Sequence, residues 1–309
     1  MKLAFLYAGQ GAQHVGMGRD LYEIYPAFRQ VLDSAPVDFD LKKLCFDGPE
    51  DQLNDTRYTQ PCMVAFAAGV TALLREAGIT PDYAAGLSLG EYSALQCAGV
   101  FDAKTAISLV AFRGQAMADA VQGRPCGMAA VLEMDRDALK AVCTEASDAG
   151  VVECTNFNCP GQIVISGDAA AVDKAGELAK AAGAKRVLPL KVSGPFHTSL
   201  MAPAGDALRE KFQSVDFGAM EIPVLFNCLG DLKGKADTIP NLLEQQVQSS
   251  VYLEDTIRRL GELGVDTVVE IGPGRTLSGF VKKTVKGIKC YPVETAEELQ
   301  AAIAALRGE

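Results

Sequence analysis

Short segments rich in apolar and β-branched residues alternate with segments of helical periodicity along most of this chain. The residues Leu3–Tyr7 predict a first strand, which a glycine-rich turn follows. Near the other end, a predicted strand over 265–271 precedes a Gly-Pro-Gly turn and a predicted helix over 275–285. Such alternation is typical of a parallel sheet covered by helices, so the predicted fold class is α/β. Further predicted elements are a helix over 61–76 that begins at Pro61, a strand over 83–87 and a helix over 102–121 capped by Asp102.

A different order of elements is predicted between residues 123 and 192. Strands are predicted over 128–133, 151–157, 162–166 and 185–191, and helices over 136–148 and 169–182. The resulting β-α-β-β-α-β order is that of a ferredoxin-like unit. We therefore expect residues 123–192 to form a small inserted domain, and residues 1–122 and 193–309 to form one large domain.

Charge and composition argue against several classes of protein. With 29 basic and 39 acidic side chains, the 309 residues carry a net charge of −10, which disfavours binding to nucleic acid or to an anionic membrane surface. The longest uncharged apolar stretch, 61–74, is shorter than the ~20 residues that a membrane-spanning helix needs. Nine cysteines without a CxxC pair predict free thiols in a reducing cytoplasm, and two histidines without a dense cysteine cluster predict no metal site.

Gly86-Leu87-Ser88-Leu89-Gly90 matches the G-x-S-x-G pattern and lies between a predicted strand and a predicted helix. In that context the pattern forms a sharp turn that exposes the serine hydroxyl, with the N–H of the next residue facing a developing oxyanion. We predict that Ser88 is a nucleophile. The alternative is an ordinary glycine-rich turn.

A serine nucleophile needs a base, and the chain offers two histidines. His14 lies in the polar turn after the first strand, where a surface or helix-start role is expected. His197 follows the end of a predicted strand, where α/β folds place functional groups. We predict that His197 is the base. Because 112 residues follow it, unlike in ordinary α/β-hydrolases, a polar or backbone group can replace the third carboxylate.

The turn Gly9-Gln10-Gly11 follows the first predicted strand. A dinucleotide-binding fingerprint would need a further glycine at position 14, which His14 occupies. Two interpretations of this turn are open. It is either a structural turn or a source of backbone N–H groups for an oxyanion.

Arg113 lies on an apolar face of its predicted helix, because Ala106, Val110 and Met117 recur with it at helical spacing. The guanidinium is therefore expected in the core, and a buried cation needs an anion. One candidate anion is an internal carboxylate such as that of Glu91. The other is a carboxylate of the substrate, which arginine can hold with two hydrogen bonds.

Several motifs resemble, in the same order and over nearly the whole chain, those of the malonyl-CoA:acyl carrier protein transacylases of fatty acid synthesis and the related acyltransferase domains of polyketide synthases. The motifs are GQGxQ at 9–13, GHSxGE at 86–91, the arginine motif at 113–114, NxNxPGQ at 156–162, the histidine motif at 194–197 and E(V/I)GPG at 270–274. The resemblance implies a hydrolase-like large domain with a parallel sheet core and a ferredoxin-like insert, in agreement with the predicted elements.

The resemblance also implies roles for residues of this sequence. Ser88 would be the acylated nucleophile, and His197 would serve as its base and then as an acid. In this family the backbone carbonyl of a glutamine orients the histidine in place of an aspartate. That glutamine aligns with Gln246.

By the same resemblance, the backbone N–H groups of Gln10 and Leu89 would form the oxyanion hole. Arg113 would hold the free carboxylate of the malonyl group. Further residues expected to bind the substrate are Asn156, Asn158, Gln162, Phe196 and Met117.

The sequence departs from the family pattern at three positions. Leu87 stands where a histidine is usual, Ala8 where a proline is common, and Ser250 where a proline is frequent. Neither Leu87 nor Ala8 would take part in the chemistry, so activity is still expected. In the polyketide relatives a phenylalanine before the catalytic histidine accompanies malonyl rather than methylmalonyl units, so Phe196 favours malonyl.

The function that the resemblance implies is a ping-pong transfer of malonyl from malonyl-CoA to acyl carrier protein through Ser88. Malonyl-CoA would be a substrate, and no permanently bound cofactor is expected. One alternative is a serine esterase or thioesterase that uses the same Ser–His pair and transfers the acyl group to water. Another is a non-catalytic acyl-binding or scaffold protein, which would tolerate the loss of the Ser88 hydroxyl.

Overall fold

A computed structural model of the chain describes residues 1–190 and 194–308. Contacts between residues divide the chain into two units. Unit 1 comprises residues 1–114, 216–226 and 257–309, and unit 2 comprises residues 115–215 and 227–256. No helix in the described parts of the chain is both long enough and apolar enough to cross a membrane.

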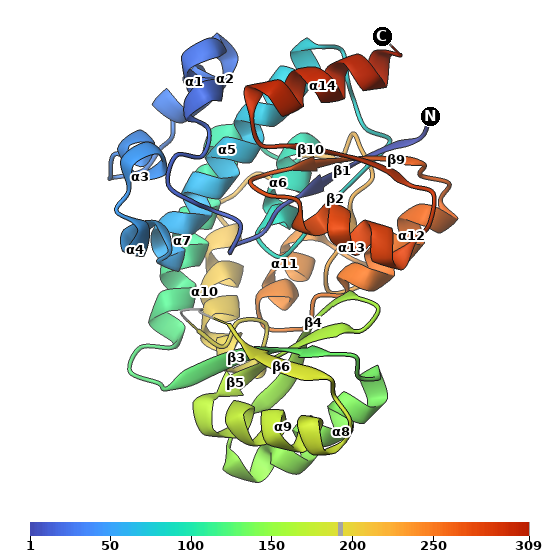
Figure 1. The fold of residues 1–309 in the computed structure, drawn as a ribbon. Coiled ribbons are helices and arrows are strands. Elements are labelled where there is room, and N and C mark those ends of the chain that lie inside the picture. Colours follow the sequence, from blue (N-terminus) through green and yellow to red (C-terminus); the bar gives the residue numbers. More distant parts are fainter. Residues whose placement is uncertain (191–193, 309) are drawn as a thin grey trace. The chain divides into compact units, whose positions relative to one another are not determined.

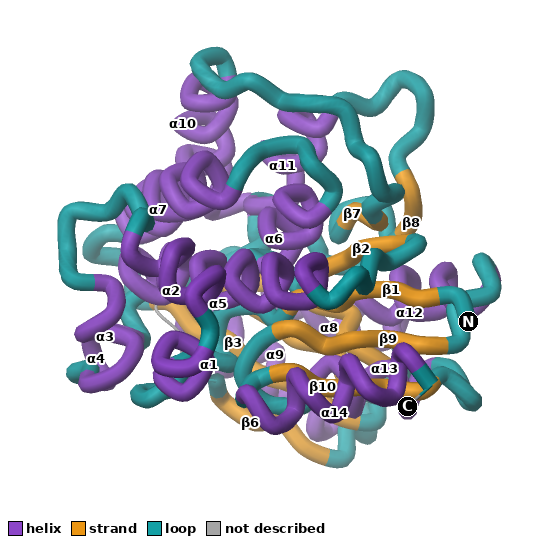
Figure 2. The backbone as a smooth tube through the Cα atoms, turned by 90° about the horizontal axis from the view of Figure 1, so that it is seen from above, coloured by secondary structure: helices purple, strands orange, loops and turns teal. Residues whose placement is uncertain are grey.

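A parallel sheet forms the centre of unit 1, as predicted. Its strands lie in the order β10-β9-β1-β2, which Figure 2 shows side by side. β1 pairs in parallel with both β2 and β9, and all of its residues are buried. The pairing sets Tyr7 beside Gly86 and Ile271, so three strands end together. The strands are β1 (Leu3–Tyr7), β2 (Tyr83–Gly86), β9 (Thr267–Ile271) and β10 (Lys289–Val293).

Helices pack on this sheet, with α6 against β1 and β2, and with α13 and α14 against β10. The helices of unit 1 are α1 (Arg19–Ile24), α2 (Pro26–Asp33), α3 (Leu41–Asp47), α4 (Glu50–Leu53), α5 (Thr56–Glu76), α6 (Gly90–Cys97), α13 (Thr276–Thr284) and α14 (Ala296–Arg307); the short strand β7 (Leu225–Phe226) also belongs to it. Two helices, α7 (Ala103–Ala120) and α12 (Leu253–Glu262), contribute residues to both units.

The predicted start of the helix at Pro61 is wrong, because α5 begins at Thr56. Asp55 caps it by accepting a hydrogen bond from the N–H of Arg57, which satisfies one of the free donors of the first turn. Pro61 therefore lies inside the helix, where it lacks a donor for the carbonyl of Arg57. The predicted end at Glu76 is confirmed, and Gly78 follows with a φ angle of 75°.

Unit 2 contains an antiparallel sheet with the strand order β4-β5-β3-β6. Helices α8 and α9 cover one face of it (Figure 1) and share a buried apolar core with the strands. The elements follow one another in the predicted order: β3 (Cys126–Leu132), α8 (Arg136–Ala146), β4 (Val152–Cys159), β5 (Gln162–Asp168), α9 (Ala169–Ala181) and β6 (Arg186–Pro189).

The remaining elements of unit 2 are the 3-10 turns η1 (Ser147–Ala149) and η2 (Ser199–Met201), the helices α10 (Ala202–Phe212) and α11 (Ile239–Val247), and the short strand β8 (Asp231–Leu232). The predicted insert, 123–192, falls within the residues of unit 2. Lys191, the predicted end of the last strand, and the predicted boundary at 192–193 lie outside the described residues. The domain boundaries therefore stay a prediction.

Candidate active site

Ser88 lies in a tight turn between β2 and α6. Its φ angle is 52°, in the left-handed region that non-glycine residues rarely adopt. The N–H of Leu87 donates to the carbonyl of Tyr7 at 3.0 Å, which ties the turn to the end of β1. In the described part of the chain, the other non-glycine residues with positive φ are Glu133 and His197. Such strain persists where surrounding structure imposes it, and it is concentrated at functional sites.

The turn requires glycine at two positions, 86 and 90, because neither position has space for a side chain. A Cβ atom on Gly86 would lie 2.0 Å from the carbonyl carbon of Gly90. A Cβ atom on Gly90 would lie 2.2 Å from the carbonyl oxygen of Tyr7. The backbone of α6 therefore begins in direct contact with the ends of β1 and β2, and this contact sets the position of Ser88.

The turn after β1 approaches the serine turn closely. A Cβ atom on Gly9 would lie 2.5 Å from the carbonyl oxygen of Leu87, so glycine is needed here as well. Gln10 follows Gly9 directly, in the turn after β1, the strand that pairs with β2. Leu89 is buried and forms the amino-terminal cap position of α6. The backbones of Gln10 and Leu89 thus belong to neighbouring turns at the same end of the sheet.

Arg113 is buried in unit 1, as its apolar helix face predicts, with 1% of its surface exposed. Its Nη1 donates to Oε1 of Gln60 at 2.9 Å, and its Cζ lies 5.5 Å from the ring centroid of Tyr92. Burial lowers the pKa of Arg113, and interactions with Tyr92 and the fully buried Glu91 oppose this effect. Because the ordinary pKa of arginine exceeds 12, the side chain keeps its charge. The site therefore holds a buried cation.

Two residues that the sequence analysis did not single out connect Arg113 to the turn after β1. The hydroxyl of Thr56 donates to Oε1 of Gln10 at 2.7 Å, and Nε2 of Gln60 donates to the Thr56 hydroxyl at 2.8 Å. Together with the bond from Arg113 to Gln60, these contacts form a chain of hydrogen bonds that is buried except at its Gln10 end. The sequence feature that could have revealed them is their spacing: Thr56 and Gln60 are polar residues four positions apart, on one face of a largely apolar helix.

Gly114 explains how α7 comes close enough for this chain. A Cβ atom on Gly114 would lie 2.7 Å from the carbonyl oxygen of Thr56, so the two helices touch backbone to backbone. The Arg-Gly pair of the sequence motif thus has two distinct functions. The arginine supplies the cation, and the glycine permits the approach of α5.

His197 lies in unit 2, just before η2, with a φ angle of 62°. Its Nδ1 is 2.8 Å from the carbonyl oxygen of Gln246 in α11, and both residues are buried. A carbonyl only accepts hydrogen bonds, so Nδ1 carries the proton and Nε2 is left as the basic nitrogen. This is the pairing that the family resemblance implies, and the resulting tautomer is the one that the predicted role of His197 as a base requires.

The other predicted substrate-binding residues have structural contacts of their own. The side chain of Asn158 donates to Oε1 of Gln162 at 3.3 Å across the β4–β5 hairpin, and the backbone of Asn156 bridges to Val251. Phe196 is buried, and Met117 is buried one helical turn from Arg113 on α7. Their roles toward substrate stay predictions.

The motif at 270–274 has a structural role that the sequence analysis did not assign. The carboxylate of Glu270 is buried and accepts hydrogen bonds from the N–H groups of Leu277 at 2.9 Å and Ser278 at 2.7 Å. Burial raises the pKa of Glu270, although these hydrogen bonds oppose the rise. A Cβ atom on Gly272 would lie 2.4 Å from Cβ of Ala8. The motif therefore anchors α13 and packs against the turn after β1.

His14 has the surface role expected of it. It is half exposed and forms an ion pair with Glu294. Partial burial acts to lower the pKa of His14, but the hydrogen bond to Glu294 and the one to the Val15 carbonyl raise it above its ordinary value.

The cysteines are free thiols, as predicted, and all nine lie in the described residues. Within residues 1–190 and 194–308, no group of three or more His, Cys, Asp or Glu side chains is arranged to hold a metal ion.

Comparison with known proteins identifies the family. The chain matches the acyl transferase domain over residues 4–304. It is 43% identical over 311 residues to a protein of Bacillus subtilis (strain 168) named malonyl CoA-acyl carrier protein transacylase, with 100% of this chain and 98% of that protein covered. The crystal structure of the malonyl CoA-acyl carrier protein transacylase of Clostridium perfringens has a TM-score of 0.95 at 38% identity, covering 100% of this chain and 98% of that one.

A second solved structure is a type II PKS acyl-carrier protein in complex with its malonyl-transacylase. The matching chain has a TM-score of 0.95 and 38% identity, and both chains are covered completely. A serine turn at the end of a parallel sheet, on a chain that matches this domain, defines an acyl transferase. Within that class, the chain belongs to the malonyl-CoA:acyl carrier protein transacylase family.

The contact at Gly90 can be tested by substitution. We expect Gly90→Ala to lower the free energy of unfolding by about 1–3 kcal/mol or more, because its Cβ would overlap the Tyr7 carbonyl. Gly279→Ala is the matched control. A Cβ atom there meets no heavy atom within 4 Å, and alanine favours a helix over glycine by about 1 kcal/mol. Thermal denaturation followed by circular dichroism measures both, and equal melting temperatures would contradict the account of this turn.

Proposed function

We propose that this protein transfers a malonyl group from malonyl-CoA to the phosphopantetheine thiol of an acyl carrier protein, through a malonyl ester on Ser88. The observation that carries the proposal is the buried cation at Arg113 in the same unit as the strained serine turn. A malonyl group differs from an acetyl group by a free carboxylate, which such a cation can bind. The names of the relatives agree on substrate and acceptor, and one relative is solved with its carrier protein.

In the first half-reaction, Nε2 of His197 takes the proton of the Ser88 hydroxyl as its oxygen attacks the thioester carbonyl. The carbon–sulfur bond of malonyl-CoA breaks, and the imidazolium returns the proton to the departing CoA sulfur. The Gln246 carbonyl supports this cycle because it holds Nδ1–H in place and stabilises the imidazolium that forms. A neutral carbonyl takes the position that an aspartate occupies in many serine hydrolases.

The carbonyl oxygen of the thioester becomes negatively charged in the transition state. We assign its two hydrogen-bond donors to the backbone N–H groups of Gln10 and Leu89, which lie in neighbouring turns at the end of the sheet. One such donor contributes about 10²–10³ in rate. Backbone donors tolerate changes of side chain, so the close approach of Gly9 to Leu87 matters more than the identity of Gln10 or Leu89.

Arg113 is assigned to the free carboxylate of the malonyl group. Its hydrogen bond to Gln60 and its position over the ring of Tyr92 restrict the guanidinium before substrate binds. A cation over an aromatic ring contributes about 2 kcal/mol when it is desolvated, which offsets part of the cost of burying the charge. The chain through Thr56 and Gln60 then ties the position of Arg113 to that of Gln10.

In the second half-reaction, the phosphopantetheine thiol replaces CoA. His197 takes the thiol proton, the sulfur attacks the malonyl ester, and the proton passes to the Ser88 oxygen as the ester bond breaks. Transfer to this thiol, rather than to water, separates the proposed enzyme from a serine esterase. Phe196 and Met117 are assigned to the acyl group, and Asn156, Asn158 and Gln162 to the acyl or pantetheine path.

We also propose a domain organisation and a cellular compartment for this protein. We assign the residues outside 123–192 to a hydrolase-like catalytic domain and residues 123–192 to a ferredoxin-like insert, which the strand order β4-β5-β3-β6 supports. The free cysteines support a reducing cytoplasm as the working compartment.

The acyl-enzyme is tested with malonyl-CoA alone. We expect intact mass spectrometry to show one added malonyl group per chain, and peptide mapping to place it on Ser88. Adding carrier protein with its phosphopantetheine should then remove the group and load the carrier. Ser88→Ala serves as the control, since it removes only the hydroxyl. An unmodified wild-type protein, or release of free malonate with no loading of the carrier, would count against the proposal.

The role of Arg113 is tested by the ratio of malonyl to acetyl transfer. We expect Arg113→Ala to lower kcat/KM for malonyl-CoA by about 100-fold relative to acetyl-CoA, because a hydrogen bond to a charged group contributes about 1.5–3 kcal/mol. Both kcat/KM values are measured on one preparation of the variant. Any unfolded fraction lowers both values equally and does not change their ratio. A change of equal size for both substrates would mean that Arg113 only supports the fold.

A further inference from the structure

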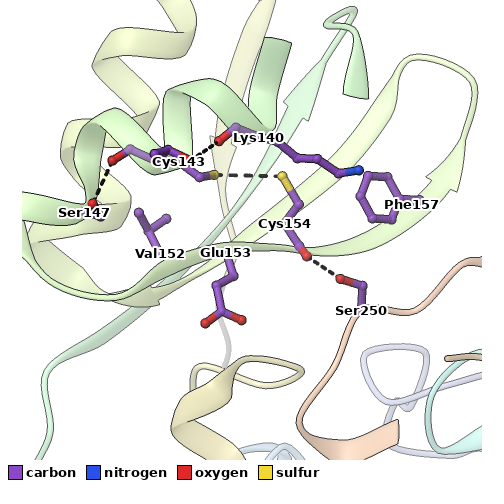
Figure 3. A pocket seen from close by; sticks show the side chains of 9 residues that line it. Lys140, Cys143, Ser147, Val152, Glu153, Cys154, Phe157 and Ser250 are labelled. Carbon is purple, nitrogen blue, oxygen red and sulfur yellow. Dashed lines mark hydrogen bonds between the residues drawn. The ribbon is translucent and has the colours of Figure 1, made fainter. Parts of the chain in front are cut away.

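A cavity in unit 2 lies between helix α8 and strand β4 (Figure 3). Its volume is about 450 Å³, and its lining includes residues of α8, η1 and β4 together with Ser250. Lys140, Thr144 and Ser147 on its wall are exposed, so solvent and small solutes reach the cavity. None of the residues that line it is assigned above to the substrate or to the reacting atoms.

Two thiols face each other in this cavity. Sγ of Cys143 on α8 lies 3.8 Å from Sγ of Cys154 on β4, and Figure 3 shows the two sulfur atoms pointing toward one another. Their residues are 6% and 8% exposed. The sulfur atoms of a disulfide are about 2.0 Å apart, so a small displacement of either side chain joins them.

The two thiols differ in acidity. The hydrogen bond between them lowers the pKa of Cys154 and raises that of Cys143, and the nearby ammonium group of Lys140 lowers the pKa of Cys154 further. The thiolate is the reactive form of a cysteine. Cys154 is therefore the more nucleophilic member, and Cys143 is placed to react with it.

Strand β4 also contacts the two segments that hold the catalytic histidine. The hydroxyl of Ser250 donates to the carbonyl of Cys154 at 2.8 Å, and Ser250 follows α11, which carries Gln246. The carboxylate of Glu153 accepts hydrogen bonds from the N–H of Ser199, two residues after His197. A displacement of Cys154 therefore affects both the segment that carries His197 and the segment that follows Gln246.

We infer that Cys143 and Cys154 are an oxidation site, at which a hydroperoxide forms a disulfide that slows malonyl transfer. The effect on rate rests on the proposed function, whereas the disulfide itself does not. The Cys154 thiolate attacks one oxygen of the hydroperoxide, so that a sulfur–oxygen bond forms, the oxygen–oxygen bond breaks and an alcohol or water leaves. The Cys143 sulfur then attacks the sulfenic sulfur, the sulfur–oxygen bond breaks, and water leaves with the Cys143 proton. Each sulfur loses one electron, and the peroxide gains two.

The disulfide slows transfer through the supports of His197. Closing the gap from 3.8 Å draws Cys154 toward α8. The carbonyl of Cys154 accepts the hydrogen bond from Ser250, and the side chain of the adjacent Glu153 accepts the one from Ser199, so both contacts are disturbed. A shift of about 1 Å in a catalytic group can cost as much as 10²-fold in rate. Reduction by a dithiol restores the two free thiols and the original geometry.

To test for the disulfide, the reduced protein is treated with hydrogen peroxide, the remaining thiols are blocked by alkylation, and the peptides are mapped by mass spectrometry. We expect a cross-linked peptide that joins Cys143 to Cys154, with the loss of two hydrogens and reversal by dithiothreitol. Malonyl transfer to carrier protein should fall at least about tenfold in kcat and recover on reduction.

Matched variants separate this site from other thiols. Cys143→Ser and Cys143→Ala should keep the basal rate of the reduced enzyme and lose the reversible inhibition. Cys62→Ser is the control, because Cys62 and Cys45 are a second hydrogen-bonded thiol pair, and neither of them lines the cavity. This variant should respond to peroxide as the wild type does.

Three results would overturn the inference: no cross-link between Cys143 and Cys154, a cross-link that leaves kcat unchanged, or the same reversible inhibition in the Cys143 variants. A reduced wild-type protein without any malonyl transfer would refute the proposed function and the rate effect with it. The peptide map would still decide whether the two thiols form the disulfide.

Discussion

The position of Ser88 depends on backbone contacts that exclude side chains at the carboxyl end of the sheet. The backbone of Gly90 contacts the carbonyl of Tyr7, and the backbone of Gly86 contacts that of Gly90. The backbones of β1, β2 and α6 therefore meet with no side chain between them. The serine between them is forced to a φ angle of 52°. A third glycine, Gly9, lets the turn after β1 contact the backbone of Leu87. The packing that strains Ser88 therefore also brings this second turn next to the serine.

A second constraint is electrostatic. The guanidinium of Arg113 is removed from water, and its neighbours include the amide of Gln60, the ring of Tyr92 and the carboxylate of Glu91. Burying a charge carries a desolvation cost, which contacts of this kind offset. In the proposed reaction the malonyl carboxylate adds a further contact, so the charge that the fold keeps out of water also selects the substrate. His197, the proposed base, is held differently, by a neutral carbonyl.

Much of the geometry of this candidate site could be predicted from the sequence because it is tied to local patterns. Glycine spacing marked the turn at Ser88, the scarcity of histidines pointed to His197, and helical periodicity placed Arg113 in the core. Thr56 and Gln60 were missed because their importance comes from contacts between α5, α7 and the turn after β1, which no local pattern encodes. For the same reason the role of Glu270 as a cap for α13 was not predicted. The start of α5 was misplaced because a proline usually marks a first turn, whereas here the cap at Asp55 decides.

A crystal structure of the enzyme trapped with malonyl-CoA would show directly which residue carries the malonyl group. The proposed mechanism requires electron density continuous with Oγ of Ser88, a malonyl carboxylate hydrogen-bonded to the guanidinium of Arg113, and Nε2 of His197 within hydrogen-bonding distance of the ester oxygen. A malonyl group on another residue would contradict it. So would an ester on Ser88 whose carboxylate faces solvent while Arg113 is held by protein groups alone.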